Sequence, residues 1–239
     1  ETEVDTQSHF NESALPRIKS YVGDTSQLRH IFEQSSEKFF HKTRILNDLC
    51  IAADTPILYN HDVDVVVLKN SHQLAYRAIT KEGSDAVYPF GCGIYQWAVT
   101  YSDQLLDKFL SSHDGNDADF EVLKDVKVRI PSSIGWGQMI TKSCEVSAGL
   151  WNEEFLSWGA EDCEFYYRLN LFGFKVGRVI DDIYHFEHGR TFNSHYHNPK
   201  FQDNDRLWNW IRTQDKESLT QYYAKLDYIK RRGKELNAS

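Results

Sequence analysis

The sequence has few of the features that would place it in a membrane or in a disulfide-rich class. It contains no run of about 18 apolar residues, the length that a membrane-spanning helix needs, and no segment that resembles a signal peptide. Its four cysteines are far apart and form no Cys-x-x-Cys pair, which argues against a zinc site and a disulfide framework. The sequence therefore predicts buried free thiols and a cytoplasmic protein, with attachment to a membrane surface left open.

Positive charge is also in deficit, with 27 Lys and Arg against 35 Asp and Glu and a net charge of −8. Coating DNA or RNA requires a basic stripe, so we expect no nucleic acid polymer as a partner, whereas a small basic pocket for one nucleotide stays compatible. Internal repeats and low-complexity linkers are absent. A glycine-rich phosphate loop is absent too, which argues against a sugar-nucleotide pyrophosphorylase.

What the sequence does contain is a globular composition that is rich in aromatic residues. Of its 239 residues, 41% are hydrophobic and 26% are charged, which rules out a disordered or collagen-like chain. A single domain is the default at this length. Aromatic residues make up 14%, with 6 Trp and 13 Tyr, and they suit either a site that stacks on sugars or bases or a heavily aromatic core.

Predicted strands and helices alternate along the chain. We expect strands at residues 28–33, 56–59, 65–68, 86–88 and 175–180. We expect helices at residues 42–53, 71–82, 103–110, 161–172, 206–211 and 217–234, with Ser71 as a cap of the second and Gly173 after the fourth. Residues 111–119 and 189–199 are predicted surface loops, and the second should become ordered when ligand binds. The alternation predicts an α/β sandwich with a mixed, mostly parallel central sheet flanked by helices.

The most specific polar feature is an acidic pair directly after an apolar strand. Asp62 and Asp64 follow the predicted strand 56–59, and α/β folds place ligands at the carboxyl ends of strands. Two carboxylates this close repel unless a cation neutralises them, and Mg²⁺ or Mn²⁺ prefers oxygen ligands that it shares with substrate phosphates. An acidic turn without a metal is the alternative interpretation.

Two further motifs are candidates for chemistry. Glu161 and Asp162 follow Trp158 at the start of a predicted helix, where carboxylates either cap the helix or, with a suitable pKa, act as a general base. His185 and His188 follow the strand predicted to end near residue 180. A turn could bring these imidazoles to a metal, or they could be partly buried structural histidines.

Together these motifs resemble those of nucleotide-sugar-dependent glycosyltransferases of the GT-A fold, most closely the β-1,4-galactosyltransferase-like group. Residues 40–47 (FHKTRILN) are similar to that group's Phe-Asn-Arg-Ala-Lys-Leu-Leu-Asn helix, and Asp62-Val63-Asp64 equals its Asp-Val-Asp motif. Residues 158–162 (WGAED) resemble its Trp-Gly-Gly-Glu-Asp acceptor motif, and residues 185–188 (HFEH) resemble its Met-x-x-His metal segment. The four motifs occur in family order at similar spacing, and the resemblance spans residues 28–204.

The resemblance implies a role for each matching residue. It implies Mn²⁺ (or Mg²⁺) as the cofactor, with Asp64, His185 and His188 as ligands. His185 replaces a thioether by an imidazole, which implies tighter metal binding. Asp162 matches the catalytic base, and Glu161 would position the acceptor. The residues implied for the donor are Lys42, Arg44, Asn47 and Asp62, with Lys42 as a point charge for a phosphate, and those implied for the sugars are Trp158 and Trp136.

The resemblance also implies one GT-A domain over residues 1–239. Residues 1–135 would form the nucleotide-sugar-binding half, 136–204 the acceptor and metal half, and 205–239 the C-terminal helices. The sequence departs from the family in lacking the first strand that ends in Pro-Phe-Arg-Asn-Arg, since residues 1–5 are more similar to the second strand. Ala160 and Cys163 replace a Gly and an Asp of the acceptor motif. The turn at residues 135–137 (GWG) and the lack of paired cysteines resemble bacterial or viral relatives.

The implied activity is an inverting, metal-dependent transfer of a sugar of the galactose or N-acetylhexosamine type, as in polysaccharide biosynthesis. The donor is a UDP-sugar, and the acceptor is a hydroxyl of a carbohydrate or glycoconjugate. The alternative is a non-catalytic sugar- or nucleotide-binding domain, because a fold does not determine a function. The departure at the first strand favours the alternative, whereas Asp64, Asp162 and His188 favour the enzyme.

Overall fold

The computed structural model describes residues 2–3, 8–114, 117–130, 133–189, 192 and 198–238. The chain forms two compact units, one of residues 1–40 with 102–122 and one of residues 41–101 with 123–239. These units have other bounds than the donor half, the acceptor half and the C-terminal helices expected from the sequence, and that functional division stays a prediction. Every predicted site residue belongs to the second unit.

The first unit is held together by a helix pair. Helix α1 (Leu15–Val22) has a proline in its first turn, where the missing N–H costs no hydrogen bond. Helix α4 (Asp103–Ser111) begins at a serine whose hydroxyl accepts a backbone hydrogen bond. Arg17 and Tyr21 of α1 both donate to the Asp107 carboxylate of α4, at 2.5 and 2.8 Å. This shared carboxylate joins the two helices.

The strand predicted at residues 28–33 is wrong, because only its last residue lies in a strand. The two-residue strands β1 (Thr2–Glu3) and β2 (Glu33–Gln34) pair in parallel. The short helical turns of the described chain are η1 (Phe10–Ala14), η2 (Gly93–Tyr95) and η3 (Phe120–Leu123).

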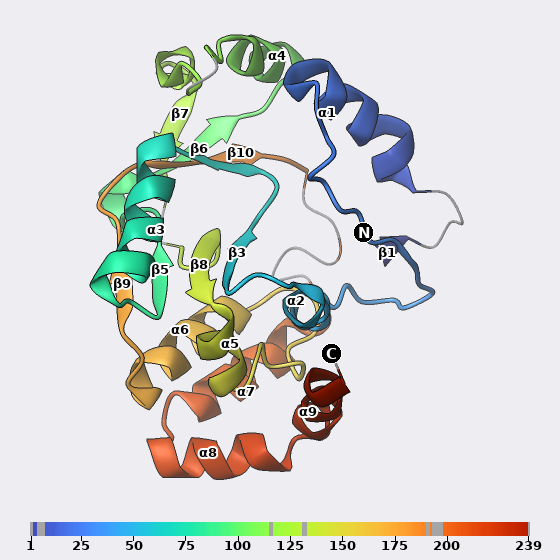
Figure 1. The fold of residues 1–239 in the computed structure, drawn as a ribbon, viewed down its shortest axis with the longest axis vertical. Coiled ribbons are helices and arrows are strands. Elements are labelled where there is room, and N and C mark those ends of the chain that lie inside the picture. Colours follow the sequence, from blue (N-terminus) through green and yellow to red (C-terminus); the bar gives the residue numbers. More distant parts are fainter. Residues whose placement is uncertain are drawn as a thin grey trace. The chain divides into compact units, whose positions relative to one another are not determined.

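Two mixed four-stranded sheets form the centre of the second unit in the part that the structure describes (Figure 1). One has the order β4 (Val65–Val67), β10 (Ile183–Glu187), β6 (Gln96–Thr100), β7 (Lys127–Arg129). The other has the order β3 (Ile57–His61), β8 (Gly137–Thr141), β5 (Ala86–Tyr88), β9 (Val176–Arg178). Helices flank both sheets, which confirms the predicted α/β class.

The structure does not have the predominance of parallel strands that the sequence predicts. In each sheet one pair of neighbours is parallel, β10 with β6 and β5 with β9, and the other two pairs are antiparallel. The sequence did not reveal β6, β7, β8 or β10. Two of these, β8 and β7, pair with their neighbours only in antiparallel fashion, and β10 adds an antiparallel pair with β4. Polar side chains inside β8 and β10 hide the apolar pattern on which strand prediction depends.

Most helices of the second unit lie where the sequence predicts them, but the helix at Lys142–Ser147 was not predicted, and the helix predicted at residues 206–211 begins at Phe201. The helices of this unit are α2 (Lys42–Ala52), α3 (Lys69–Glu82), α5 (Lys142–Ser147), α6 (Glu161–Phe172), α7 (Phe201–Ile211), α8 (Lys216–Lys225) and α9 (Asp227–Ala238). The helix predicted at residues 217–234 is two helices, since Leu226 is extended between α8 and α9. Ser71 does not cap α3, which begins after Leu68; its buried hydroxyl donates to Asp181 at 2.6 Å.

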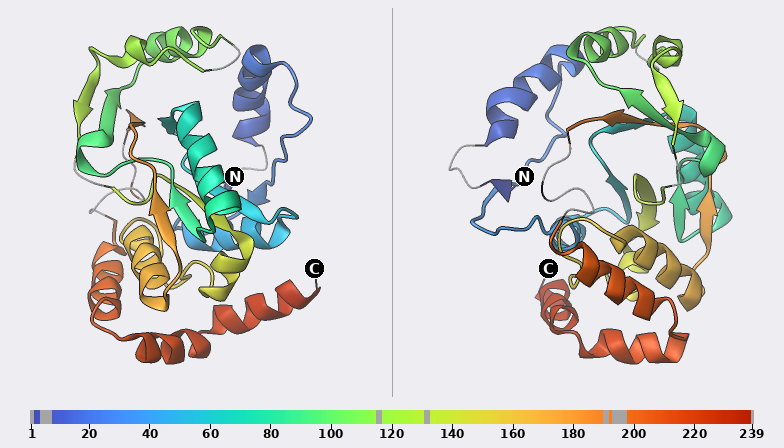
Figure 2. Two further views of the ribbon diagram at one scale, coloured as in Figure 1. Left: turned by 60° about the vertical axis from the view of Figure 1, so that its left-hand side comes forward. Right: turned by 180° about the vertical axis from the view of Figure 1, so that it is seen from behind.

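Helix α6 packs against the core below the β3–β8–β5–β9 sheet and lies beside α7 (Figure 2). Acidic residues in its first turn and Gly173 at its end, with a φ of 87°, favour the helix at both ends. Phe165 stacks on Trp151 with ring centroids 4.3 Å apart. The fully buried Arg168 binds Glu164 at 2.7 Å and the carbonyl of Leu150 at 2.8 Å, so its charge is paired.

The four cysteines are free, and the expectation of buried thiols holds for two of them. Cys50 and Cys144 are buried, Cys163 is partly exposed and Cys92 is exposed. Among the described helices, none combines the length and the apolar character required to cross a membrane.

Candidate functional site

The candidate site is built around the turn between β3 and β4. The N–H of Asp62 donates to the carbonyl of Trp136 at 3.2 Å, and the N–H of Phe186 donates to the carbonyl of Asp64 at 2.8 Å. Strand β10 pairs antiparallel with β4, with His185 opposite Val65. The turn is therefore held by the backbone on both sides, and Asp64 lies beside the strand that carries His185.

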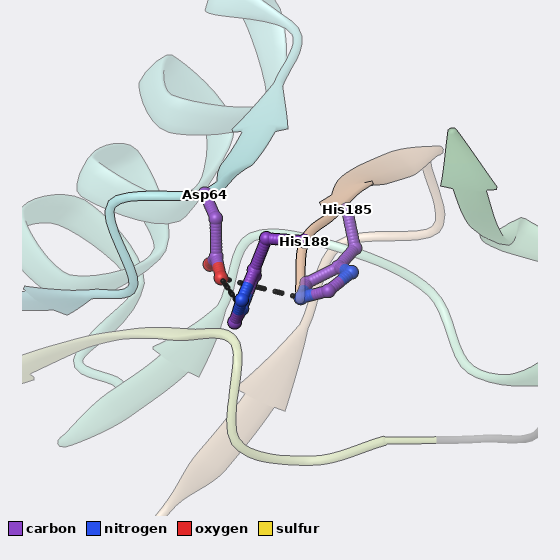
Figure 3. Close-up of side chains that lie close together, drawn as sticks. All are labelled: Asp64, His185 and His188. Carbon is purple, nitrogen blue, oxygen red and sulfur yellow. Dashed lines mark ion pairs between the residues drawn. The ribbon is translucent and has the colours of Figure 1, made fainter. Parts of the chain in front are cut away.

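Asp64, His185 and His188 converge although more than 120 positions separate the first from the other two (Figure 3). Oδ2 of Asp64 lies 3.0 Å from Nε2 of His188 and 3.4 Å from Nε2 of His185. One potential ligand atom from each residue lies within 4.8 Å of the other two. His185 is buried and His188 is exposed, so the cluster opens toward solvent on one side.

Both imidazoles present the same nitrogen to Asp64. Nδ1 of His188 lies 2.8 Å from the carbonyl of Gly189, and Nδ1 of His185 lies 2.9 Å from Oε1 of Glu187. A carbonyl oxygen only accepts, so Nδ1 of His188 carries a proton, and Nε2 is the nitrogen of this ring that a cation could take. In metal-binding histidines, one ring nitrogen is likewise hydrogen-bonded to an oxygen while the other faces the metal.

The charges of the cluster shift its pKa values. Burial acts to raise the pKa of Asp64, but the hydrogen bond and charge of His185 outweigh it and hold that pKa below its usual value. Burial acts to lower the pKa of His185, but Asp64 and Glu187 outweigh it and raise that pKa. In the metal-free protein, the carboxylate and the imidazole thus stabilise each other's charged forms.

Trp136 was expected to contact a sugar, and the structure places it against the cluster. Its ring stacks on His185, with centroids 5.4 Å apart and planes inclined by 15°. It also lies against Phe90 in a buried apolar cluster. The indole therefore fixes the plane of the His185 ring.

Lys42 lies among three carboxylates. Its Nζ is 3.5 Å from Oδ1 of Asp62, 3.6 Å from Oε1 of Glu161 and 3.7 Å from Oδ1 of Asp162. Burial acts to lower the pKa of Lys42, but these carboxylates outweigh it and raise that pKa far above its usual value. The ammonium expected to contact a donor phosphate is thus engaged by carboxylates in this structure.

Of the carboxylates beside Lys42, Glu161 is buried, whereas Asp62 and Asp162 are partly exposed. Burial raises the pKa of Asp162, and Lys42 partly opposes this shift. Burial, followed by the charge of Asp162, also raises the pKa of Glu161. The buried Oδ1 of Asp162 has no hydrogen-bond partner within the described part of the chain, apart from the ammonium of Lys42 at 3.7 Å. A carboxylate whose oxygen faces only an ammonium and accepts no hydrogen bond is suited to receive a proton from a ligand.

The turn before α6 has an unusual backbone. Gly159 has a φ of 134° and Ala160 a φ of 65°, and the N–H of Gly159 donates to Oε2 of Glu161 at 3.2 Å. Alanine in the left-handed region costs about 1 kcal/mol, so Ala160 stores strain at this turn. Trp158, 36% exposed, stacks on Phe201 with centroids 5.6 Å apart.

A pocket with a cavity volume of about 30 Å³ begins at Asp62, two residues from Asp64. Its lining includes two predicted donor residues, Lys42 and Asp62, and the predicted base, Asp162. The other lining residues were not selected by the sequence analysis; they are Leu46, Asn60, His61, Tyr88, Ile134, Gly135, Gln138 and Trp151. The amide of Gln138 donates to the hydroxyl of Tyr88 at 2.8 Å. Asn60 and His61 directly precede Asp62, which is the signal by which they could have been found.

Two residues expected to contact the donor, Asn47 and Arg44, do not line this pocket. Asn47 is fully buried, and its amide binds the backbone of Trp151 on both sides and also Glu153. Arg44 pairs with Asp48 one helical turn away, at 3.6 Å. Most of the predicted loop at residues 189–199 lies outside the described residues.

Comparisons with known proteins add a likeness in fold. No model of a protein family matches the sequence, and no curated protein matches it significantly. The structure is similar to the catalytic domain of Drosophila β1,4-galactosyltransferase 7 in complex with xylobiose, with a TM-score of 0.47 and 15% identity over 90% of this chain and 79% of that one. A mutant of the same enzyme with manganese, UDP-Gal and xylobiose is similar with a TM-score of 0.42 and 15% identity, over 84% of this chain and 79% of that one.

Proposed function

We propose that this chain is a metal-dependent glycosyltransferase that moves a sugar from a UDP-sugar to a carbohydrate hydroxyl with inversion. The observation that carries the proposal is the position of the Asp64–His185–His188 cluster beside the pocket that contains Asp162. The turn from Asp62 to Asp64 joins the two, since Asp62 lines the pocket and Asp64 belongs to the cluster. A cation site next to a buried carboxylate is the arrangement that transfer from a sugar diphosphate requires.

The donor set of the cluster fits a divalent cation. Asp64 offers a carboxylate oxygen, and His185 and His188 offer Nε2 atoms whose partner nitrogens are already bound. A bound cation would supply Lewis-acid stabilisation of the negative charge on a leaving diphosphate. Carboxylate and imidazole also suit Zn²⁺ and Fe²⁺, so the metal has to be identified by experiment.

Asp162 is the proposed base. An acceptor hydroxyl is a weak nucleophile, and the buried Oδ1 of Asp162 can take its proton as the oxygen attacks the anomeric carbon. Burial alone would favour a neutral carboxyl group, and the ammonium of Lys42 opposes this effect. A single displacement from the face opposite the diphosphate inverts the anomeric centre.

The pocket offers hydrogen-bonding groups that suit a sugar. Asn60, His61, Gln138 and Tyr88 can exchange hydrogen bonds with hydroxyl groups. Burial lowers the pKa of His61, so its ring stays neutral at pH 7. The exposed face of Trp158 is a stacking surface for an acceptor ring. Glu161 already binds Lys42 and the turn at Gly159, so in our proposal it shapes the acceptor side through this turn.

The test is an assay of UDP release and sugar transfer on a panel of UDP-hexoses and UDP-N-acetylhexosamines with Mn²⁺, Mg²⁺, Zn²⁺ or Fe²⁺. Asp162→Asn keeps the shape of the side chain and should lower the transfer rate by about 10²–10⁴-fold. UDP and Mn²⁺ binding, measured by calorimetry, should be retained, because neither uses the base. Asp205→Asn on the exposed face of α7 is the matched control and should leave the rate unchanged. A protein that binds UDP-sugars but turns over none of them would instead be the non-catalytic binding domain.

A further inference from the structure

Glu187 lies beside the Asp64–His185–His188 cluster without belonging to it. It lies two residues after His185 in strand β10, and side chains two apart point to the same face of a strand. Its Oε1 is 2.9 Å from Nδ1 of His185, and its side chain is 39% exposed. The carboxylate thus reaches the nitrogen of His185 that faces away from Asp64.

The stacking of Trp136 on His185 does not determine which edge of the imidazole faces Asp64. The stacked indole fixes the plane of the imidazole. A rotation of the ring by 180° about the Cβ–Cγ bond keeps this plane but exchanges the positions of the ring nitrogens with those of ring carbons. After such a flip, Nε2 would no longer lie 3.4 Å from Asp64. Carboxylates on both sides of the ring distinguish the two orientations, and Glu187 makes the shorter contact, 2.9 Å against 3.4 Å for Asp64.

We propose that Glu187 is a positioning residue that keeps the proton of His185 on Nδ1 and thereby directs the Nε2 lone pair to the cation beside Asp64. This inference rests on the proposed metal-dependent function. His188 has a backbone carbonyl in the same role, so the two imidazoles are oriented by different means. A side chain can be removed by mutation and a carbonyl cannot, which makes His185 the testable member of the pair.

The first experiment uses the metal-free protein, so it does not depend on whether metal binds. Nitrogen NMR of selectively labelled histidine reports which ring nitrogen of His185 is protonated, with His185→Gln used to assign its signals. At a pH above the titration of His185, where its ring holds one proton, that proton should be on Nδ1 in wild type and in Glu187→Gln, whose amide oxygen still accepts, because the contact of Nδ1 with Glu187 is shorter, at 2.9 Å, than that of Nε2 with Asp64, at 3.4 Å. In Glu187→Ala this preference should disappear. If His185 keeps its Nδ1 proton in Glu187→Ala, the inference is overturned.

The second experiment measures Mn²⁺ affinity by electron paramagnetic resonance. Removing such an outer carboxylate typically weakens metal binding by about 10–100-fold, so we expect this loss in Glu187→Ala and a smaller loss in Glu187→Gln. Glu217→Ala removes the same charge from the exposed start of α8 and should leave the affinity unchanged. Equal affinities in wild type and Glu187→Ala would overturn the inference. If the wild type itself does not bind Mn²⁺, the metal part of the proposed function fails, and the NMR result still decides the role of Glu187.

Discussion

Gly135 lies against the carboxylate of Asp162 so closely that a Cβ on Gly135 would be 1.8 Å from Oδ2. The φ of Gly135 lies outside the left-handed region, so its backbone would accept another residue. Glycine is required at this position because the Asp162 carboxylate leaves no room for a Cβ. On the opposite side, the ammonium of Lys42 is 3.7 Å from Oδ1. The proposed base thus lies between a backbone without a side chain and a partly buried cation.

Gly135→Ala should therefore displace the Asp162 carboxylate without disturbing the backbone. A misplacement by about 1 Å can lower a catalysed rate by about 10²-fold, and we expect a loss of this order in kcat. Mn²⁺ binding should be retained, because the Asp64 cluster does not include Asp162. Gly233→Ala in α9 is the control, since a Cβ there meets no atom within 4 Å. Wild-type kcat in Gly135→Ala would show that the position of Asp162 does not limit catalysis.

The ion pairs of Lys42 predict a change in pH dependence. Lys42 acts to lower the pKa of Asp162, against burial. Its removal in Lys42→Met should raise that pKa and move the acidic limb of kcat/KM to higher pH. Lys42→Arg keeps the charge and should keep the limb near its wild-type position.

The resemblance of residues 40–47 to the nucleotide-binding helix predicts another outcome. If Lys42 binds a donor phosphate, Lys42→Met should raise KM for the donor and leave the acidic limb in place. That result would contradict the role inferred from the three ion pairs. Lys230→Met on the exposed part of α9 controls for the loss of one positive charge.

Glu145 predicts how the stability of the fold depends on pH. Burial raises its pKa from 4.5 to about 7, although Asn60 donates to its Oε2 at 3.1 Å. Between these two pH values, the folded protein holds a proton that the unfolded chain has released, so the free energy of unfolding falls as pH rises. The accumulated loss is on the order of 3 kcal/mol for a shift of this size.

Glu145→Gln should remove this loss, because its amide does not titrate and can still accept from Asn60. Urea unfolding at pH 5 and pH 8 measures the difference, and the variant should lose less stability than wild type between the two pH values. Glu154→Gln, at an exposed position, should behave as wild type. A variant with the same pH dependence as wild type would show that Glu145 is ionised in the folded protein.

Local sequence signals predicted most of the helices and part of the site. Helix α6 was found at its observed bounds because its acidic first turn and Gly173 are both local. The turn with Asp62 and Asp64 was found because carboxylates follow an apolar run. Strands β8 and β10 were missed, because their polar side chains have a purpose only in the folded sheet.

The sequence by itself determined most of the helices, the acidic turn and, through four short motifs, a resemblance that named Asp64, His185 and His188 together. Only the tertiary structure decided which side chains meet. Lys42 is surrounded by carboxylates, Asn47 is buried against Trp151, and Trp136 stacks on His185 rather than standing free. The physical reason is that β10 lies between β4 and β6, so contacts across more than 100 positions depend on strand register. No local pattern encodes that register.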